Sequence, residues 1–149
     1  VYDDPANLTG RAHMMSAAMM GATAFQKGLG AIHALSHPIG AIYHTHHGTT
    51  NAVVMQAVMR FNRIEIEDRF VAVARYLGIE GGFDGFYDFV GGLVKYLNIP
   101  KNLTDLGLRD LGDADLDRIV AAALTDPSAK GNPRELTAKN ARELLEACF

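Results

Sequence analysis

The amino-acid sequence predicts an all-α fold, a bundle-like domain of several helices, and three observations carry this prediction. Apolar residues recur at spacings of three and four along most of the chain, which places them on one face of a helix. No stretch of useful length alternates polar and apolar residues as a half-buried strand does. The chain has 149 residues, of which 48% are hydrophobic and 21% charged, so it can bury one core without disulfides or structural metals. We therefore expect a single helical domain.

The first half of the chain predicts three helices, over residues 6–26, 31–37 and 48–62. Asn7 or Thr9 can cap the start of the first helix, and the pair Gly28–Gly30 is best explained as its C-terminal cap. Pro38 and Gly40 predict that the second helix stops after residue 37. The N-cap candidates of the third helix are Thr49, Thr50 and Asn51.

The second half predicts four more helices, over residues 65–77, 83–97, 113–124 and 137–147. Gly78 ends the first of them, and Pro100 follows the second. The acidic first turn at Asp113 suits a helix dipole, and Thr137 is the expected N-cap of the last helix. Residues 103–111 and 125–135 are expected to form loops.

Composition excludes several functional classes. The formal net charge of −3 argues against nucleic acid as a main partner, because neutralising phosphates needs a basic surface. No apolar run reaches the ~18 residues of a membrane span, and residues 1–30 lack the layout of a signal peptide. The single cysteine, Cys148, excludes an internal disulfide and fits the reducing cytoplasm. Because the first residue is Val1 and not methionine, we expect an upstream segment.

Five of the six histidines fall within residues 33–47: His33, His37, His44, His46 and His47. His33 and His37 are four residues apart, so their rings share one helix face. His47 lies just before the next helix. Neutral imidazole is a common ligand for Zn, Fe, Ni and Cu, and an unligated histidine can move protons near neutral pH. The cluster is therefore a candidate metal site.

The spacing supplies only part of such a site. Two histidines four residues apart are more often partly buried or capped than bound to a metal. His44 and His46 are expected to be solvated residues of a turn. A catalytic metal normally has three protein ligands and an open position. The nearest further candidates have spacings that do not suit one face: Asp3, Asp4 and His13. Three later carboxylates are expected to be solvated: Glu65, Glu67 and Asp68. The residues alone indicate half a metal site.

The histidine segment resembles the signature of the iron-containing (group III) alcohol dehydrogenases. That signature reads G-x-x-H-x-x-x-H-P-x-G, followed by a short turn and H-G, and residues 30–40 and 47–48 match it. The separation of His33 and His47 also matches. The resemblance continues in Asn51–Ala52, Arg60–Phe61–Asn62, Leu97–Asn98–Ile99–Pro100, Asp126–Pro127 and Asn132–Pro133–Arg134–Glu135–Leu136–Thr137. One departure is His46, where the family usually has proline; we expect its side chain to line the cleft.

The resemblance implies a two-domain enzyme of the dehydroquinate-synthase-like superfamily. Its N-terminal α/β domain binds NAD or NADP, and its C-terminal all-helical domain carries the metal; residues 1–149 resemble the second domain alone. By this resemblance His33 and His47 are two ligands of Fe(II), or of Zn(II). His37 is the catalytic residue and contacts the nicotinamide cofactor. The remaining ligands, an aspartate and a histidine, are expected just upstream of Val1.

The implied activity is hydride exchange between a small alcohol or aldehyde and NAD or NADP, with the metal holding the alcohol oxygen and His37 passing its proton toward solvent. Because two ligands and the main cofactor site are expected elsewhere, the isolated 149 residues are expected to be inactive. Two alternatives stay open: a non-catalytic helical module that binds metal or another protein, and a relative of the maleylacetate reductase or glycerol dehydrogenase type. An apolar patch left by the missing domain favours a homo-oligomer.

Overall fold

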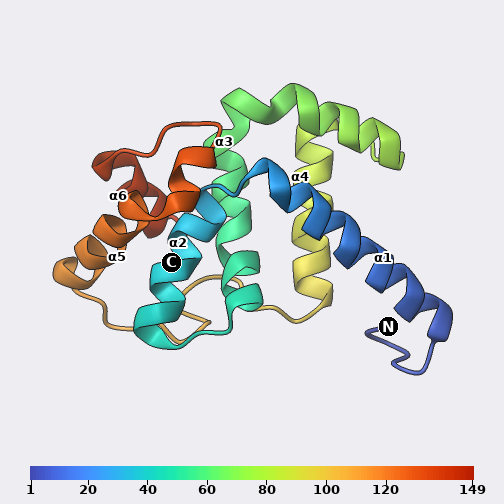
Figure 1. Ribbon diagram of the computed structural model, residues 1–149, viewed down its shortest axis with the longest axis horizontal. Helices are drawn as coiled ribbons and strands as arrows, with labels where there is room; N and C mark the ends of the chain where they lie inside the picture. The colour runs from blue at the N-terminus through green and yellow to red at the C-terminus, as the bar shows by residue number, and fades with distance from the viewer.

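The computed structural model describes residues 1–149 and confirms the all-α prediction. Its helices are α1 (Leu8–Ala24), α2 (Ala31–Tyr43), α3 (His47–Leu77), α4 (Gly82–Tyr96), α5 (Asp113–Thr125) and α6 (Ala138–Glu146), with short 3-10 segments η1 (Phe25–Lys27) and η2 (Pro127–Gly131). Figure 1 shows α2, α5 and α6 gathered beside the first part of α3, while α1 and α4 lie on the other side. None of these helices combines the length and the apolar character that a membrane crossing requires.

The hydrophobic core lies where α2, α3, α5 and α6 meet. Each helix contributes at least one large side chain that is almost fully buried: Leu35 and Ile39 from α2, Val54 from α3, Ile119 from α5 and Leu145 from α6. Burying an aliphatic side chain of this size contributes about 1.5–3 kcal/mol. The core therefore fixes α2, the helix that carries His33 and His37.

The predicted end of α2 at residue 37 is wrong. The helix continues through Pro38 and Gly40 to Tyr43 and ends at His44, whose φ of 56° is left-handed. Proline inside a helix loses one backbone hydrogen bond and costs about 3 kcal/mol. Here Pro38 and Ile39 are both buried in the core, and this burial favours continuing the helix over turning the chain.

The two helices predicted over residues 48–62 and 65–77 are one helix of 31 residues, α3. No glycine or proline lies between Asn62 and Glu65 to interrupt it, although Figure 1 shows α3 changing direction within its length. Its N-cap is His46, whose ring nitrogen accepts a hydrogen bond from the backbone N–H of Thr49. The cap candidates Thr49, Thr50 and Asn51 were therefore wrong, and His46 has a structural role.

Helix α1 forms as predicted but does not bury the predicted face. Asn7 caps it by accepting a hydrogen bond from Gly10 N–H at 2.8 Å. Gly28, with φ of 107°, follows the 3-10 turn that ends this helical segment, as the cap interpretation expects. No residue of α1 is buried, and Met15 is 75% and Met19 67% exposed. Its apolar side chains are therefore largely exposed in this chain.

The remaining helices lie within one or two residues of their predicted bounds. Thr137 caps α6 through a reciprocal pair of hydrogen bonds with Asn140. Residues 125–135 contain the short segment η2, which sequence periodicity did not indicate. Three carboxylates of α3 are exposed as predicted: Glu65, Glu67 and Asp68.

Asn132 joins three parts of the fold. Its Oδ1 accepts hydrogen bonds from the first N–H of α2, at Ala31 (3.0 Å), and from the Asn62 side chain on α3 (2.9 Å). Its Nδ2 donates to Asn62 Oδ1 at 2.8 Å. The approach is so close that a Cβ at Gly30 would lie 2.9 Å from Asn132 Oδ1. Asn132 thus ties the start of α2 to α3.

We expect Asn132→Ala to lower the free energy of unfolding by roughly 2–3 kcal/mol, because it leaves the buried Asn62 amide without a partner. Asn62→Ala should cost a similar amount, and in the double variant the two losses should fail to add by about 1 kcal/mol or more. The measurement is chemical denaturation. Lys139→Ala, on an exposed face of α6, is the control and should change stability by less than about 0.5 kcal/mol. Fully additive losses would contradict the coupling.

Burial makes Cys148 unreactive. The side chain is 4% exposed, and desolvation raises the pKa of its thiol from 9.0 to about 12. We expect alkylation at pH 8 to be at least ~100-fold slower in the folded protein than in guanidinium. Because the folded pKa is the higher one, this group contributes stability below pH 9 that is lost as pH rises toward 12. Equal alkylation rates in the two states would show that the C-terminal helix opens readily.

Candidate functional site

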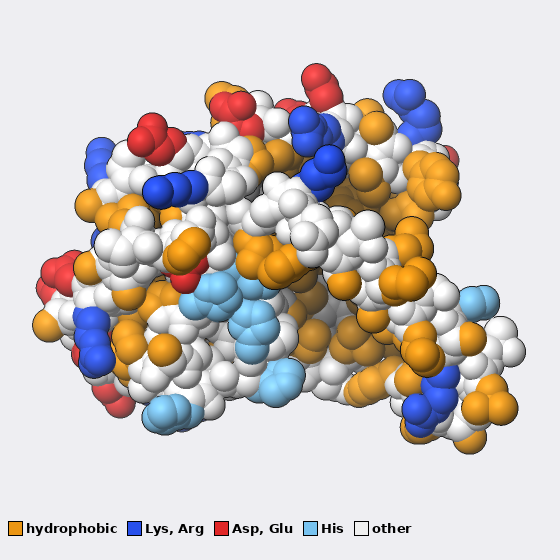
Figure 2. All heavy atoms as spheres, in the orientation of Figure 1, with side chains coloured by type: hydrophobic (Ala, Val, Ile, Leu, Met, Phe, Trp, Pro, Cys, Tyr) orange, Lys and Arg blue, Asp and Glu red, His pale blue; other side chains and the backbone are white.

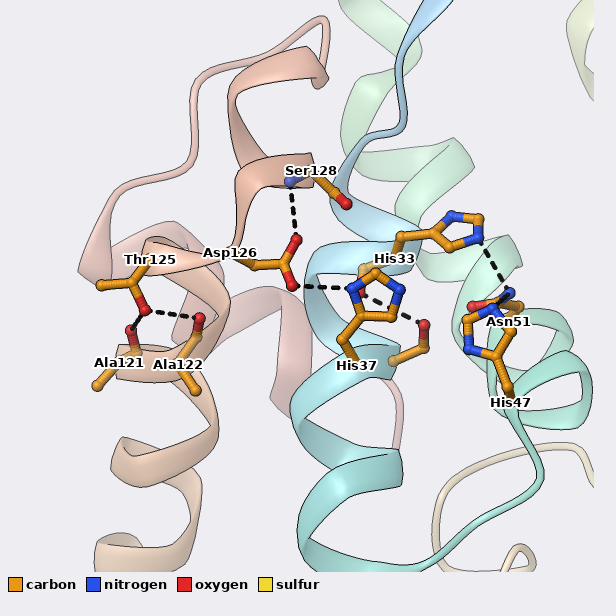
Figure 3. Close-up of polar contacts among 10 residues, drawn as sticks. His33, His37, His47, Asn51, Ala121, Ala122, Thr125, Asp126 and Ser128 are labelled. Atoms are coloured by element: carbon orange, nitrogen blue, oxygen red, sulfur yellow. Dashed lines mark hydrogen bonds and ion pairs between the residues drawn. The ribbon is translucent and has the colours of Figure 1, made fainter. Parts of the chain in front are cut away.

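Three histidines meet on one side of the helical core. His33 and His37 lie one turn apart on α2, and His47 is the first residue of α3. The tight turn at residues 44–46 brings the start of α3 back beside α2. Ring centroids are 5.3 Å apart for His33 and His47, and 5.5 Å apart for the two pairs that include His37. Figure 3 shows these side chains facing one another between the two helices.

The Nε2 atoms of His33 and His47 converge on a single group, the side-chain amide of Asn51. Asn51 Nδ2 lies 3.3 Å from His33 Nε2 and 3.0 Å from His47 Nε2 (Figure 3). An amide N–H can only donate, so both Nε2 atoms accept and both imidazoles carry their proton on Nδ1. Both Nε2 atoms therefore lie within hydrogen-bond distance of one group, and an imidazole Nε2 with a free lone pair is a common metal ligand.

Asn51 was not predicted as a site residue, because it was interpreted as a helix cap. It lies four residues after His47 on α3. Because residues i and i+4 share a helix face, this spacing could have indicated that Asn51 lies beside His47. Its Oδ1 is buried and has no hydrogen-bond partner.

His37 is oriented by a carboxylate from a distant part of the chain. Its Nδ1 lies 2.8 Å from Asp126 Oδ2, and Asp126 Oδ1 accepts from Ser128 N–H at 2.7 Å. Burial raises the pKa of the Asp126 carboxyl, but the hydrogen bonds from His37 and Ser128 outweigh it and lower the pKa overall. Asp126 is thus an anion that binds the Nδ1–H of His37 and leaves Nε2 free. No role is expected for Asp126 from the sequence, because 89 residues separate it from His37.

The environment of His33 favours its neutral form. Burial lowers the pKa of His33, and charge on His37 and His47 would lower it further, while Asp126 opposes the shift. A neutral imidazole is the form that binds metal. His33 is therefore suited to act as a ligand near neutral pH.

The other candidates do not join this group. His44 is exposed at the left-handed end of α2, His46 caps α3, and His13 is exposed on α1. Asp3 accepts a hydrogen bond from Tyr96 instead. His46 was expected to line a cleft, and its contacts are those of a helix cap.

The donor set fits part of a metal site. No group of three or more His, Cys, Asp or Glu side chains in this chain could hold an ion by itself. Two imidazole nitrogens aimed at one point supply half of a four-coordinate site for Fe(II) or Zn(II).

The three histidines face solvent beside a hollow. Figure 2 shows histidine side chains gathered near the middle of this face, next to a depression with largely hydrophobic walls below α1. No histidine lines any of five cavities found elsewhere on the protein. The largest of them, about 530 Å³, lies instead among residues that include Leu108, Leu116 and Phe149. The histidine cluster is therefore open on one side.

Comparison with known proteins identifies related chains. The 4-hydroxybutyrate dehydrogenase of Cupriavidus necator is 40% identical over 146 residues, which cover 91% of this chain and 37% of that protein. The lactaldehyde reductase of Escherichia coli K12 is 35% identical over 129 residues, covering 82% of this chain and 33% of that protein. The chain thus spans about a third of the length of these relatives.

Solved structures show the same fold. The alcohol dehydrogenase from Oenococcus oeni superposes with a TM-score of 0.86 at 27% identity, covering 96% of this chain and 39% of that one. The maleylacetate reductase from a Rhizobium species gives a TM-score of 0.61 at 27% identity, covering 82% and 32%. Residues 1–149 also match the family described as "Fe-containing alcohol dehydrogenase family, C-terminal". The chain belongs to the iron-containing alcohol dehydrogenase family and corresponds to its C-terminal part.

Proposed function

We propose that this chain is the helical, metal-holding domain of a two-domain alcohol dehydrogenase that uses NAD or NADP. The observation that carries the proposal is the convergence of His33 Nε2 and His47 Nε2 on one point, beside a third histidine bound to a carboxylate. The family membership of residues 1–149 supports it. The dinucleotide-binding domain and the remaining metal ligands belong to residues outside this chain.

In this proposal His33 and His47 hold Fe(II), with Zn(II) as the alternative. Their Nε2 lone pairs are free of protons and already aimed together. When bound, the ion supplies Lewis-acid chemistry that favours the alkoxide form of an alcohol. The chain's own contribution is to hold two imidazoles on a rigid frame, since α2 is buried against α3 and α5.

His37 moves the proton of the alcohol, and Asp126 orients the His37 ring. Because Asp126 binds the Nδ1–H, His37 keeps an Nε2 lone pair that can accept a proton on the open side of the cluster. The Asp126 carboxylate then stabilises the imidazolium that forms. His37 is half-exposed, and the proton can pass from it to solvent. The nicotinamide of the cofactor is expected next to this ring.

The substrate is a small alcohol or the corresponding aldehyde. This expectation is supported by relatives named for 4-hydroxybutyrate, lactaldehyde and 1,3-propanediol, and by the hollow with hydrophobic walls beside the histidines (Figure 2). Because relatives that are 40% and 31% identical are named as dehydrogenases of alcohols, we favour the alcohol dehydrogenase branch over the maleylacetate reductase branch. The alternative is that the chain is a metal-binding module without catalytic activity. Turnover of an alcohol by the full-length protein would distinguish the enzyme from such a module.

Replacing either proposed ligand should remove the metal. In the full-length protein we expect His33→Ala and His47→Ala each to weaken Fe(II) or Zn(II) binding at least ~100-fold, more than the loss of an outer partner costs, and to abolish turnover. His37→Ala should keep its metal and lose turnover. Metal content by elemental analysis and alcohol-dependent reduction of NAD or NADP are the readouts, with His13→Ala as the control. Metal retained in His33→Ala and lost in His37→Ala would reverse the assignment.

Replacing Asp126 should slow turnover and leave the metal in place. We expect Asp126→Ala to lower kcat between ~10-fold and ~10²-fold, a fraction of the ~10²–10⁴-fold that general acid–base catalysis contributes, because His37 loses its fixed ring orientation. The Michaelis constant for the alcohol should change much less. Thr125→Ala is the matched control, because it removes a neighbouring hydroxyl that bonds the Ala121 and Ala122 carbonyls and not Asp126. An unchanged kcat in Asp126→Ala would show that His37 needs no partner.

A further inference from the structure

The Asn51 side chain occupies the point on which His33 and His47 converge. Its Nδ2 lies 3.3 Å and 3.0 Å from their Nε2 atoms, and a primary amide has two hydrogens, one for each acceptor. We propose that Asn51 is a place-holder: it fills the ion's position in the metal-free protein and must turn away before an ion can enter. This inference rests on the proposed function, because it requires that these two histidines be ligands.

Space is the first argument. A bond from an imidazole nitrogen to zinc is about 2.0–2.1 Å long. The amide nitrogen of Asn51 lies 3.0 Å from one of the two Nε2 atoms and 3.3 Å from the other. An ion bound to both lone pairs and the amide nitrogen therefore compete for one space. The amide and the ion also compete for the same electron pairs, since each Nε2 has a single lone pair.

The other end of the amide supplies the second argument. Asn51 Oδ1 is buried and has no hydrogen-bond donor, and an unsatisfied buried carbonyl is unfavourable. The amide nitrogen thus gives each imidazole a hydrogen bond, while the amide oxygen has none. Asn51 and His47 share one face of α3, so rotation of the Asn51 side chain alone can release both rings without any movement of the helix.

A place-holder has a defined kinetic signature. Metal can bind only to the fraction of molecules in which the amide has turned away, and the apparent affinity is reduced by that fraction. The rate of metal entry is reduced by the same factor. The rate of metal release is unaffected, because in the loaded protein the amide has already left. A residue with a merely structural role would have no reason to change entry and spare release.

The experiment follows Co(II) uptake by the metal-free full-length protein in a stopped-flow spectrometer, and Co(II) release into excess chelator. We expect Asn51→Ala and Asn51→Ser to take up Co(II) at least threefold faster than wild type, with release unchanged. The serine side chain is too short to reach both nitrogens, and it provides a second variant should alanine disturb folding. Gln56→Ala is the matched control, because it removes an amide from the same helix that contacts Tyr87 instead.

The uptake and release rates together decide whether Asn51 is a place-holder. Uptake as slow as wild type in a folded Asn51 variant, or release accelerated as much as uptake, overturns the place-holder and leaves the proposed function standing. If the wild-type protein takes up no Co(II), then His33 and His47 are not ligands, and both proposals fail. Faster uptake with unchanged release supports the inference, provided that Gln56→Ala behaves as wild type.

Discussion

The packing of α2 between α3 and α5 is the constraint on which the rest of the structure depends. Leu35 and Ile39 bury one side of α2 completely, and Asn132 fixes its first turn by accepting the N–H of Ala31. The opposite side of the same helix carries His33 and His37. Burial of one side of α2 thus determines where the imidazoles of His33 and His37 lie. Because α2 is held at its first turn and along its buried face, the two rings have little freedom to move apart.

The site is completed by segments that are distant in sequence. The turn at residues 44–46 brings His47 to His33, and η2 brings Asp126 to His37. The two pairs have different chemistry, although they are built on one helix. His33 and His47 accept hydrogen bonds at Nε2, as ligands do, whereas His37 donates from Nδ1 to a carboxylate, as a proton-transferring histidine does. This difference is the basis for our proposal that His33 and His47 hold the metal and that His37 is the catalytic residue.

The helical class and most helix bounds could be predicted from the sequence, because apolar periodicity and capping residues act locally. The errors came from tertiary packing. Burial of Pro38 and Ile39 carries α2 past a residue that usually ends helices, and α1 exposes the apolar face that its periodicity predicts to be buried. Within the site, the clustering of histidines indicated the segment, and the family resemblance selected His33, His37 and His47 from it. Asp126 could not be found from spacing, because only the fold brings η2 to α2.

Under the proposed function, one ion binds between His33 and His47. Anomalous diffraction at the iron edge, from crystals of the iron-loaded full-length protein, tests this binding. We expect one strong anomalous peak about 2 Å from the Nε2 atoms of His33 and His47, close to the length of a zinc–imidazole bond, with His37 unligated and still bound to Asp126. A peak bonded to His37, or located away from these helices, would contradict it.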